Sequence, residues 1–414
     1  MMRSKTCRTC VIGVALSVAL SLSACGSSGG SSGGSSGGGG AALKVAAVTS
    51  QTGTYASLGA QAINAVKFAA DQANANGGVD GHHVDMVALD AGSSPQEAVQ
   101  QTQKAIQQDG SPYIIGTVSS AQSLAIAGQI EALNGLQLVT ISKTDELTGK
   151  ACNSRVFRTD HSDSMDAATV GPWLKTQTAK TWSFIGADYA WGRDGESTFE
   201  KVAKQNGMTV TKKLFPPLGT KDFGSYISQL ADNQTQGLMV YLAGGDSNNF
   251  VKQARQFGLF DKYQTEIGVS YVTQGGIAAT GDAMLGLGAV INYAASIPTA
   301  QNKTFVDSWA KKFNGAYPTN FESETYLGMQ TLFAAVAKAK SVDPKKVADA
   351  MNSVSLDSVY GNVSMRSSDH TLILPNYVGA PVKSSDPGGY TFKIALTVPA
   401  EEASPAGPGC GSGK

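Results

Sequence analysis

Hydroxyl and aromatic side chains gather in short segments that follow predicted strands, and these are the side chains best suited to bind or convert a small molecule. Four such segments read TSQTGTYAS, TVSSAQ, SKTDE and GADYAWGRD. Hydroxyl and amide groups can hydrogen-bond the polar end of a ligand, and aromatic rings can cover its apolar part. The sequence therefore predicts a pocket for a small polar molecule.

Groups that would support catalysis or hold a metal are sparse. The sequence has no phosphate-binding loop, no G-x-S-x-G nucleophile motif and no Cys/His set with zinc spacing. Of the four histidines, His82 and His83 are adjacent, so on a strand they would point to opposite sides. We expect no cofactor, no metal and no enzymatic activity.

The composition narrows the classes of molecule that could be binding partners. The 414 residues carry 32 Lys+Arg and 32 Asp+Glu, which gives no net charge to neutralise a phosphate backbone. Nucleic acid is thus not an expected partner. At 42% hydrophobic residues the composition is globular, and the length is enough for two ordinary domains.

The N-terminus has the pattern of an export signal. Arg3, Lys5 and Arg8 precede an uncharged run over residues 11–24 that is too short for a membrane span. The next residue is Cys25, and L-S-A-C resembles the bacterial lipobox. We predict a signal peptide over 1–24, lipidation of Cys25, a Gly/Ser tether over 25–42, and a body held at the outer face of the cytoplasmic membrane. The alternative is an ordinary signal peptide cut before an incidental cysteine.

Two cysteines remain beyond the leader and the lipid site, Cys152 and Cys410. In an oxidising compartment an even pair predicts a disulfide. The bridge would fix the Pro/Gly-rich tail, 399–414, to the body. Two free thiols are the alternative.

The body alternates strand and helix patterns. LKVAAVT (43–49) reads as a strand, and a helical pattern follows it and ends at Gly77-Gly78. The same alternation continues to about residue 270 in two runs, each of domain size. Strict alternation gives parallel sheets with helices on both faces, so we predict an α/β fold with two doubly wound parallel sheets. Ligand groups then collect at the carboxyl ends of the strands.

The order of several motifs resembles the leucine/isoleucine/valine-type substrate-binding proteins of ABC importers. The opening, LKVAAVTSQTGTYASLGAQ, is followed in order by YIIGTVSSAQSLAIAG, VFRTDHSDS, DYAWGRDG, VKQARQFGL and YGNVSMRS. The resemblance implies a periplasmic binding protein type I clamshell whose two lobes are joined by three crossings, near 159–161, 291–294 and 360–364. Lobe 1 would then comprise 43–160 plus 293–361. Lobe 2 would comprise 161–292 plus 362–398.

The resemblance also implies which residues touch the ligand. Ser120, at a helix N-terminus, matches the serine that meets a ligand carboxylate, and unpaired helix N–H groups favour an anion there. For Ser120 the alternative is a plain N-cap. For Trp191 the alternative is packing at the edge of the hinge. The further matching positions are Ser142, Thr144, Tyr55, Leu58, Trp191 and Phe321.

The ammonium side of such a site departs from the family pattern. The loop that carries an acid in amino-acid binders has Ser270 and Tyr271 here. Asp246 or Asp188 are candidate substitutes, although loop aspartates are usually turn or cap residues. The family's bridging cysteines match Ser93 and Ser119, so that disulfide is absent. The ligand is therefore an amino acid, or a carboxylate or amide without an ammonium group.

The expected function is capture of a small-molecule ligand by closure of a monomeric clamshell and its delivery to ABC permease subunits. One alternative is a sensor or scavenger with the same fold and no transport partner. Another is an amidase or esterase that uses Ser120 or Ser142. The enzyme is disfavoured because neither serine has a plausible histidine base, His161 being placed near a crossing.

Overall fold

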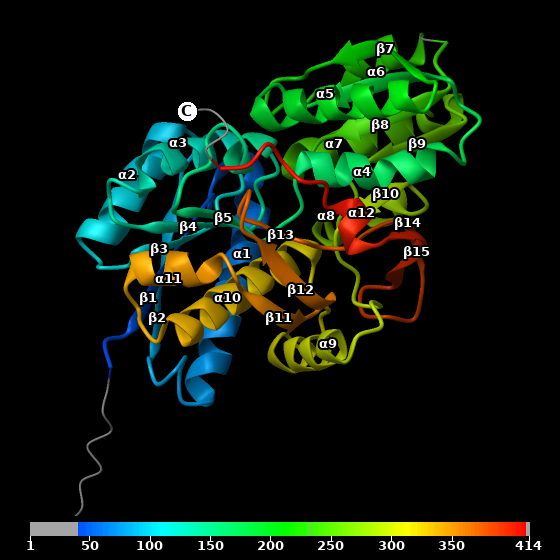
Figure 1. The fold of residues 1–414 in the computed structure, drawn as a ribbon. Helices are drawn as coiled ribbons and strands as arrows, with labels where there is room; N and C mark the ends of the chain where they lie inside the picture. Colours follow the sequence, from blue (N-terminus) through cyan, green and yellow to red (C-terminus); the bar gives the residue numbers. More distant parts are fainter. Residues whose placement is uncertain (1–39, 233, 411–414) are drawn as a thin grey trace, which may run out of the picture. The chain divides into compact units, whose positions relative to one another are not determined.

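Two sheets organise the chain (Figure 1). The structure is a computed structural model and describes residues 40–232 and 234–410. The first sheet has the strand order β11-β12-β13-β5-β4-β3-β1-β2 and is parallel from β13 to β2. Its strands are β1 (Leu43–Thr49), β2 (Val84–Asp90), β3 (Tyr113–Ile115), β4 (Leu136–Val139), β5 (Val156–Arg158), β11 (Ser355–Ser358), β12 (Gly361–Arg366) and β13 (Thr371–Leu372).

The second sheet has the order β15-β14-β10-β9-β8-β6-β7. It is parallel from β10 to β7, and β14 and β15 add to it in antiparallel fashion. Its strands are β6 (Thr181–Gly186), β7 (Thr209–Leu214), β8 (Gly237–Tyr241), β9 (Thr265–Gly268), β10 (Ala289–Ile291), β14 (Asn376–Lys383) and β15 (Tyr390–Val398).

Helices connect and cover the strands. Near the first sheet α1 packs on α10 and α2 on α3, while near the second α4 packs on α5 and β14. None of the helices in the described part of the chain is long and apolar enough to cross a membrane. The helices are α1 (Ala56–Ala75), α2 (Pro95–Gln107), α3 (Ser120–Ile130), α4 (Asp163–Leu174), α5 (Ala190–Gln205), α6 (Gly224–Ala231), α7 (Gly244–Gln256), α8 (Gln274–Thr280), α9 (Ala300–Lys312), α10 (Asn320–Ala339), α11 (Pro344–Met351) and α12 (Ala400–Ala403).

Local sequence explains where several of these helices begin. Ser94 and Glu97 form a capping box at the start of α2, and Thr319 and Glu322 form another at α10. Helix α10 is buried throughout its first half, 320–329, and its buried residues there include polar side chains such as Glu322 and Glu324. Helices α2 and α10, which are far apart in the sequence, therefore both begin at a capping box and both pack against strands of the first sheet.

The predicted pair of largely parallel sheets is confirmed, and one predicted crossing needs correction. Strands β12 and β13 belong to the first sheet. The chain therefore passes to the second sheet for the last time between Leu372 and Asn376, and not near 360–364. The reason is a hairpin: β11 pairs antiparallel with β12, and Gly361 takes the positive φ of +90° that the tight turn requires.

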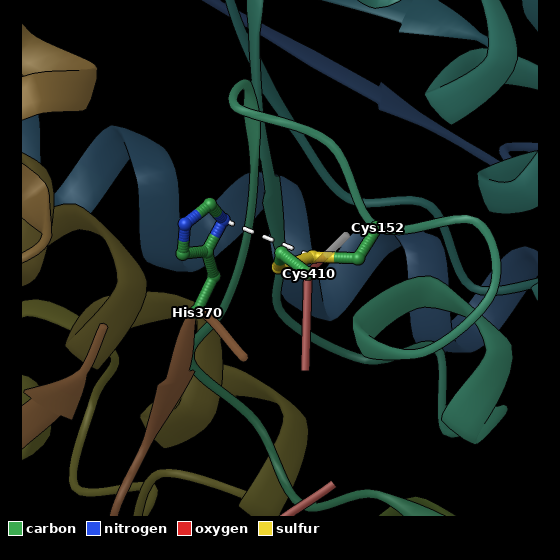
Figure 2. Close-up of side chains that lie close together, drawn as sticks. All are labelled: Cys152, His370 and Cys410. Carbon is green, nitrogen blue, oxygen red and sulfur yellow. Dashed lines mark hydrogen bonds between the residues drawn. A yellow bond between two sulfur atoms is a disulfide. The ribbon is translucent and has the colours of Figure 1, made fainter. Parts of the chain in front are cut away.

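The C-terminal tail is attached to the body at several points. Cys152 and Cys410 are joined as a disulfide, and the His370 ring lies beside it (Figure 2). Helix α12 packs on α4, and the Arg366 guanidinium donates hydrogen bonds to the carbonyls of Ser404 and Pro405. The predicted signal peptide, Cys25 and nearly all of the tether lie outside the described residues.

Candidate ligand-binding site

One pocket is formed by loops of both sheets and by α10. About 280 Å³ of empty space lies among its side chains, part of it open to solvent. The structure thus gathers six of the ten predicted ligand-binding residues around one space, although ligand binding by them stays a prediction. The lining consists of Tyr55, Leu58, Val118, Ser120, Ile141, Lys143, Tyr189, Trp191, Ala243, Ser270 and Phe321.

Ser120 stands at the start of α3. The N-cap position is held by Ser119, whose side chain makes no capping bond, so the interpretation of Ser120 as the plain N-cap is wrong. Ser120 is 1% exposed, and its Oγ lies 3.4 Å from the backbone N–H of Thr144, which donates to it. A hydroxyl beside the free N–H groups of a helix N-terminus can hydrogen-bond a carboxylate.

Aromatic side chains enclose much of the remaining pocket. The hydroxyls of Tyr55 and Tyr189 are 2.8 Å apart, and burial raises the pKa of both phenols, so both remain protonated. Only one of the two hydroxyl protons is used in their mutual bond. The Trp191 ring packs against Tyr189 and Tyr241, and its buried Nε1 has no acceptor among the described residues. The indole N–H of Trp191 is therefore a donor without a partner in the described part of the chain, on a side chain that lines the pocket.

Four of the ten predicted residues, and the alternative acid Asp188, do not line this pocket. The Ser142 hydroxyl is 2.6 Å from both the Thr117 carbonyl and the Ser123 hydroxyl, and the Thr144 hydroxyl donates to Asp194. Tyr271 is fully buried in the core beside the second sheet. Asp246 accepts hydrogen bonds from a backbone N–H in the neighbouring loop, and Asp188 forms an exposed pair with Arg193. Ile141 and Lys143 face the pocket instead, as alternation along an extended segment requires.

A family model described as periplasmic binding protein matches residues 42–386. The chain belongs to this family. A curated relative, the leucine-, isoleucine-, valine-, threonine- and alanine-binding protein of Pseudomonas aeruginosa, is 27% identical over 332 residues, covering 78% of this chain and 85% of the relative. The Leu/Ile/Val-binding protein of Citrobacter freundii is 29% identical over 330 residues, covering 78% and 86%.

Solved periplasmic binding proteins have the same fold as this family member. A solute-binding protein from Rhodopseudomonas palustris BisB5, in complex with 3,4-dihydroxybenzoic acid, matches with a TM-score of 0.80 and 23% identity, covering 87% of this chain and 98% of that one. An amino acid ABC transporter substrate-binding protein from Pseudomonas fluorescens Pf-5 matches with a TM-score of 0.77 and 22% identity, covering 88% and 98%. At these identities the likeness concerns the fold.

Lys143 is a pocket residue of this binding protein that sequence reasoning missed. Its side chain is 4% exposed and its Nζ lies 2.9 Å from Asp166 Oδ2. Burial lowers the pKa of the ammonium, but Asp166 and Glu324 more than offset that effect, so the pKa of Lys143 is raised and the charge is kept. Because Asp166 neutralises this ammonium, Lys143 brings no net positive charge to the wall.

Asp163 was also missed. It is the first residue of α4 and is fully buried, and neither carboxylate oxygen has a hydrogen-bond partner in the part of the chain that the structure describes. Burial, with Asp145 and Asp166 nearby, raises the pKa of Asp163 well above its usual value. In the sequence it follows Ser162, which is the N-cap, so it reads as an ordinary first-turn acid. It does not line the pocket but interacts electrostatically with Tyr189.

Asp246 gives a test by pH. Burial raises the pKa of this carboxyl from 3.8 to about 6, against the opposing effect of the Gly219 N–H. Between these values the native protein binds more protons than the unfolded chain, so the contribution of Asp246 to stability falls as pH rises through 6. Asp246→Asn should therefore gain stability relative to the natural protein between pH 4 and pH 7, as measured by urea unfolding. Parallel pH profiles would contradict the raised pKa.

Proposed function

We propose that this protein is the extracytoplasmic solute-binding component of an ABC importer and captures a small carboxylate between two lobes. The observation that carries the proposal is the shared pocket. Tyr55 and Ser120 come from the side of the first sheet, and Tyr189 and Trp191 from the side of the second. A ligand that contacts both sets stabilises the arrangement in which the lobes are closed.

The polar groups of the pocket support a carboxylate. Ser120, the first N–H groups of α3, the Trp191 Nε1 and one tyrosine hydroxyl are the donors of the residues that line it. Leu58, Val118, Ile141 and Phe321 supply the apolar surface. This chemistry fits the amino acids named for the curated relatives and the aromatic acids named for solved neighbours such as the protein bound to 3,4-dihydroxybenzoic acid.

A second ligand class is an amino acid, the class named for the curated relatives. Asp163 does not line the pocket, so a ligand ammonium held there would not contact this carboxyl. Amino acids and aromatic carboxylates are therefore both included in the test of function.

The lobes and the location of the protein are part of this proposal. Sheet membership of the strands supports one lobe that includes 43–158 and 355–372 and another that includes 181–291 and 376–398. The lipobox-like L-S-A-C ending at Cys25 supports a lipid anchor, and the Gly/Ser run supports a tether at the outer face of the membrane. The transport partner is inferred from the family.

The function is tested by a thermal-shift screen against amino acids, amides and aromatic carboxylates, followed by calorimetry on any ligand found. Binding to the folded protein raises the unfolding temperature, and the stabilisation grows with the logarithm of the ligand concentration relative to its dissociation constant. Mass spectrometry of the recovered ligand should show it unchanged. Failure of every carboxylate to bind, or conversion of the ligand, would overturn the proposal.

Ser120→Ala is expected to weaken binding of the identified carboxylate about 10- to 100-fold, because a hydrogen bond to a charged group contributes about 1.5–3 kcal/mol. Isothermal titration calorimetry measures the change. Ser119→Ala is the matched control, since Ser119 is the adjacent serine, lies outside the pocket lining and makes no capping bond. Equal losses in the two variants would remove Ser120 from the site.

A further inference from the structure

The ammonium of Lys143 lies where segments that run between the two sheets meet. It donates to the His161 carbonyl at 3.2 Å, to Asp166 Oδ2 at 2.9 Å and to Asn292 Oδ1 at 3.0 Å. His161 lies in the first segment, just before α4, and Asn292 directly follows β10, at the start of the second. An ammonium has three N–H donors, and all three are used here.

Asp166 extends this junction to the third segment. Its Oδ1 accepts from Asn292 Nδ2 at 2.9 Å and from Asn376 Nδ2 at 3.1 Å. Asn376 is the first residue of β14, where the chain enters the second sheet for the last time. The two asparagines are also bonded to each other, at 3.2 Å. One buried ion pair therefore holds all three segments.

The same lysine forms part of the pocket wall. It comes from the segment that follows β4, two residues after Ile141, and lines the pocket together with Ser120. Its donors are all used at the junction and its charge is paired with Asp166, so its contribution to the pocket comes from its hydrocarbon stem. A ligand that packs on the stem thus contacts the side chain that holds the junction.

We propose that Lys143 is a positioning residue that sets the angle between the two sheets at which the pocket side chains converge, and thereby couples pocket occupancy to that angle. The inference rests on the proposed function. A change of angle moves the three segments relative to the loop after β4. The directed bonds of Lys143 and Asp166 would then break, which leaves buried polar groups unpaired and is strongly disfavoured.

The test compares the natural protein with Lys143→Met/Asp166→Asn. Methionine keeps most of the stem, and asparagine avoids leaving an unpaired charge. Nitroxide labels on an unnatural amino acid at the exposed positions 104 in α2 and 204 in α5 report the distance between the two sides by pulsed electron resonance. We expect the ligand-free distribution to become about twofold wider, because the closed arrangement loses its junction.

An exposed ion pair provides the matched control. Lys312 and Asp71 join α9 to α1 on the side of the first sheet, with 47% and 46% of their side chains exposed. Lys312→Met/Asp71→Asn should leave the distance distribution unchanged. An unchanged distribution in Lys143→Met/Asp166→Asn would overturn the proposal, as would equal broadening in both double variants.

Ligand titrations then separate this proposal from the proposed function. With L-leucine and 4-hydroxybenzoate as probes, the junction variant should bind about tenfold more weakly, as expected when the competent population falls to about one tenth. Weaker binding with an unchanged distance distribution would make Lys143 a wall residue only and overturn the coupling. If neither probe binds the natural protein, the choice of ligand class fails, and the ligand-free distances still decide the role of Lys143.

Discussion

Lys143→Met is expected to lower the free energy of unfolding by about 3–5 kcal/mol, the cost of removing one partner of a buried ion pair. The loss arises because Asp166, which is fully buried, would be left without a cation beside it. Two amides would still donate to the Asp166 carboxylate, but neither brings a charge. Urea unfolding followed by circular dichroism at pH 7 measures the change.

Two comparisons make this prediction specific. Lys143→Met/Asp166→Asn should recover most of the lost stability, because no isolated charge then remains in the interior. Lys312→Met removes an exposed partner and should cost no more than about 1 kcal/mol. A double variant as unstable as Lys143→Met, or a loss in that single variant no larger than for Lys312→Met, would show that the ion pair does not hold the junction.

Periodicity was a sufficient guide to the parallel part of the fold. The apolar run of β1, the alternation in β2 and the capping box that begins α2 carry their structure in a few adjacent residues, so local patterns predicted them. Strands β11 to β13 were harder because they are short and pair antiparallel at a sheet edge. Their placement depends on the turn at Gly361 and on pairing with β5, which is distant in sequence.

The site could be predicted where the residue type at a helix start was informative. It could not be predicted where the contacts join residues that are far apart in the sequence. Ser120 and Trp191 follow strands and reach the pocket as predicted. In I-S-K-T the hydroxyl residues were chosen, yet Ile141 and Lys143 face the pocket, since alternate residues of an extended segment point to opposite sides. Lys143 donates a hydrogen bond to Asn292, which lies 149 positions later in the chain. No local sequence pattern indicates such a partner.

The shared role of the segment after β4 links the pocket to the crossings. Its alternate residues serve two purposes: Ser142 is bonded to the loop before α3, and Lys143 to the segments between the sheets. A ligand that displaces this segment would therefore disturb both the loop before α3 and the segments between the sheets.

The second large prediction concerns Trp191 and separates the contribution of its ring from the contribution of its indole N–H group. Trp191→Phe keeps an aromatic wall and removes a donor that has no acceptor among the described residues. Stability should change by less than about 1 kcal/mol, because no hydrogen bond is lost. Binding of the identified ligand should weaken about tenfold, the value of one hydrogen bond, as measured by calorimetry.

Trp191→Ala removes the ring as well. The expected loss of stability is about 3–5 kcal/mol, the usual cost of a large-to-small change in a packed site, and binding should fall at least about 100-fold because the wall is missing. Trp309→Phe is the matched control, since Trp309 is equally buried but packs on Phe68 and Phe313, away from the pocket. It should leave affinity unchanged. If Trp191→Phe binds as tightly as the natural protein, the ligand does not use the indole N–H, and the wall acts through apolar contact alone.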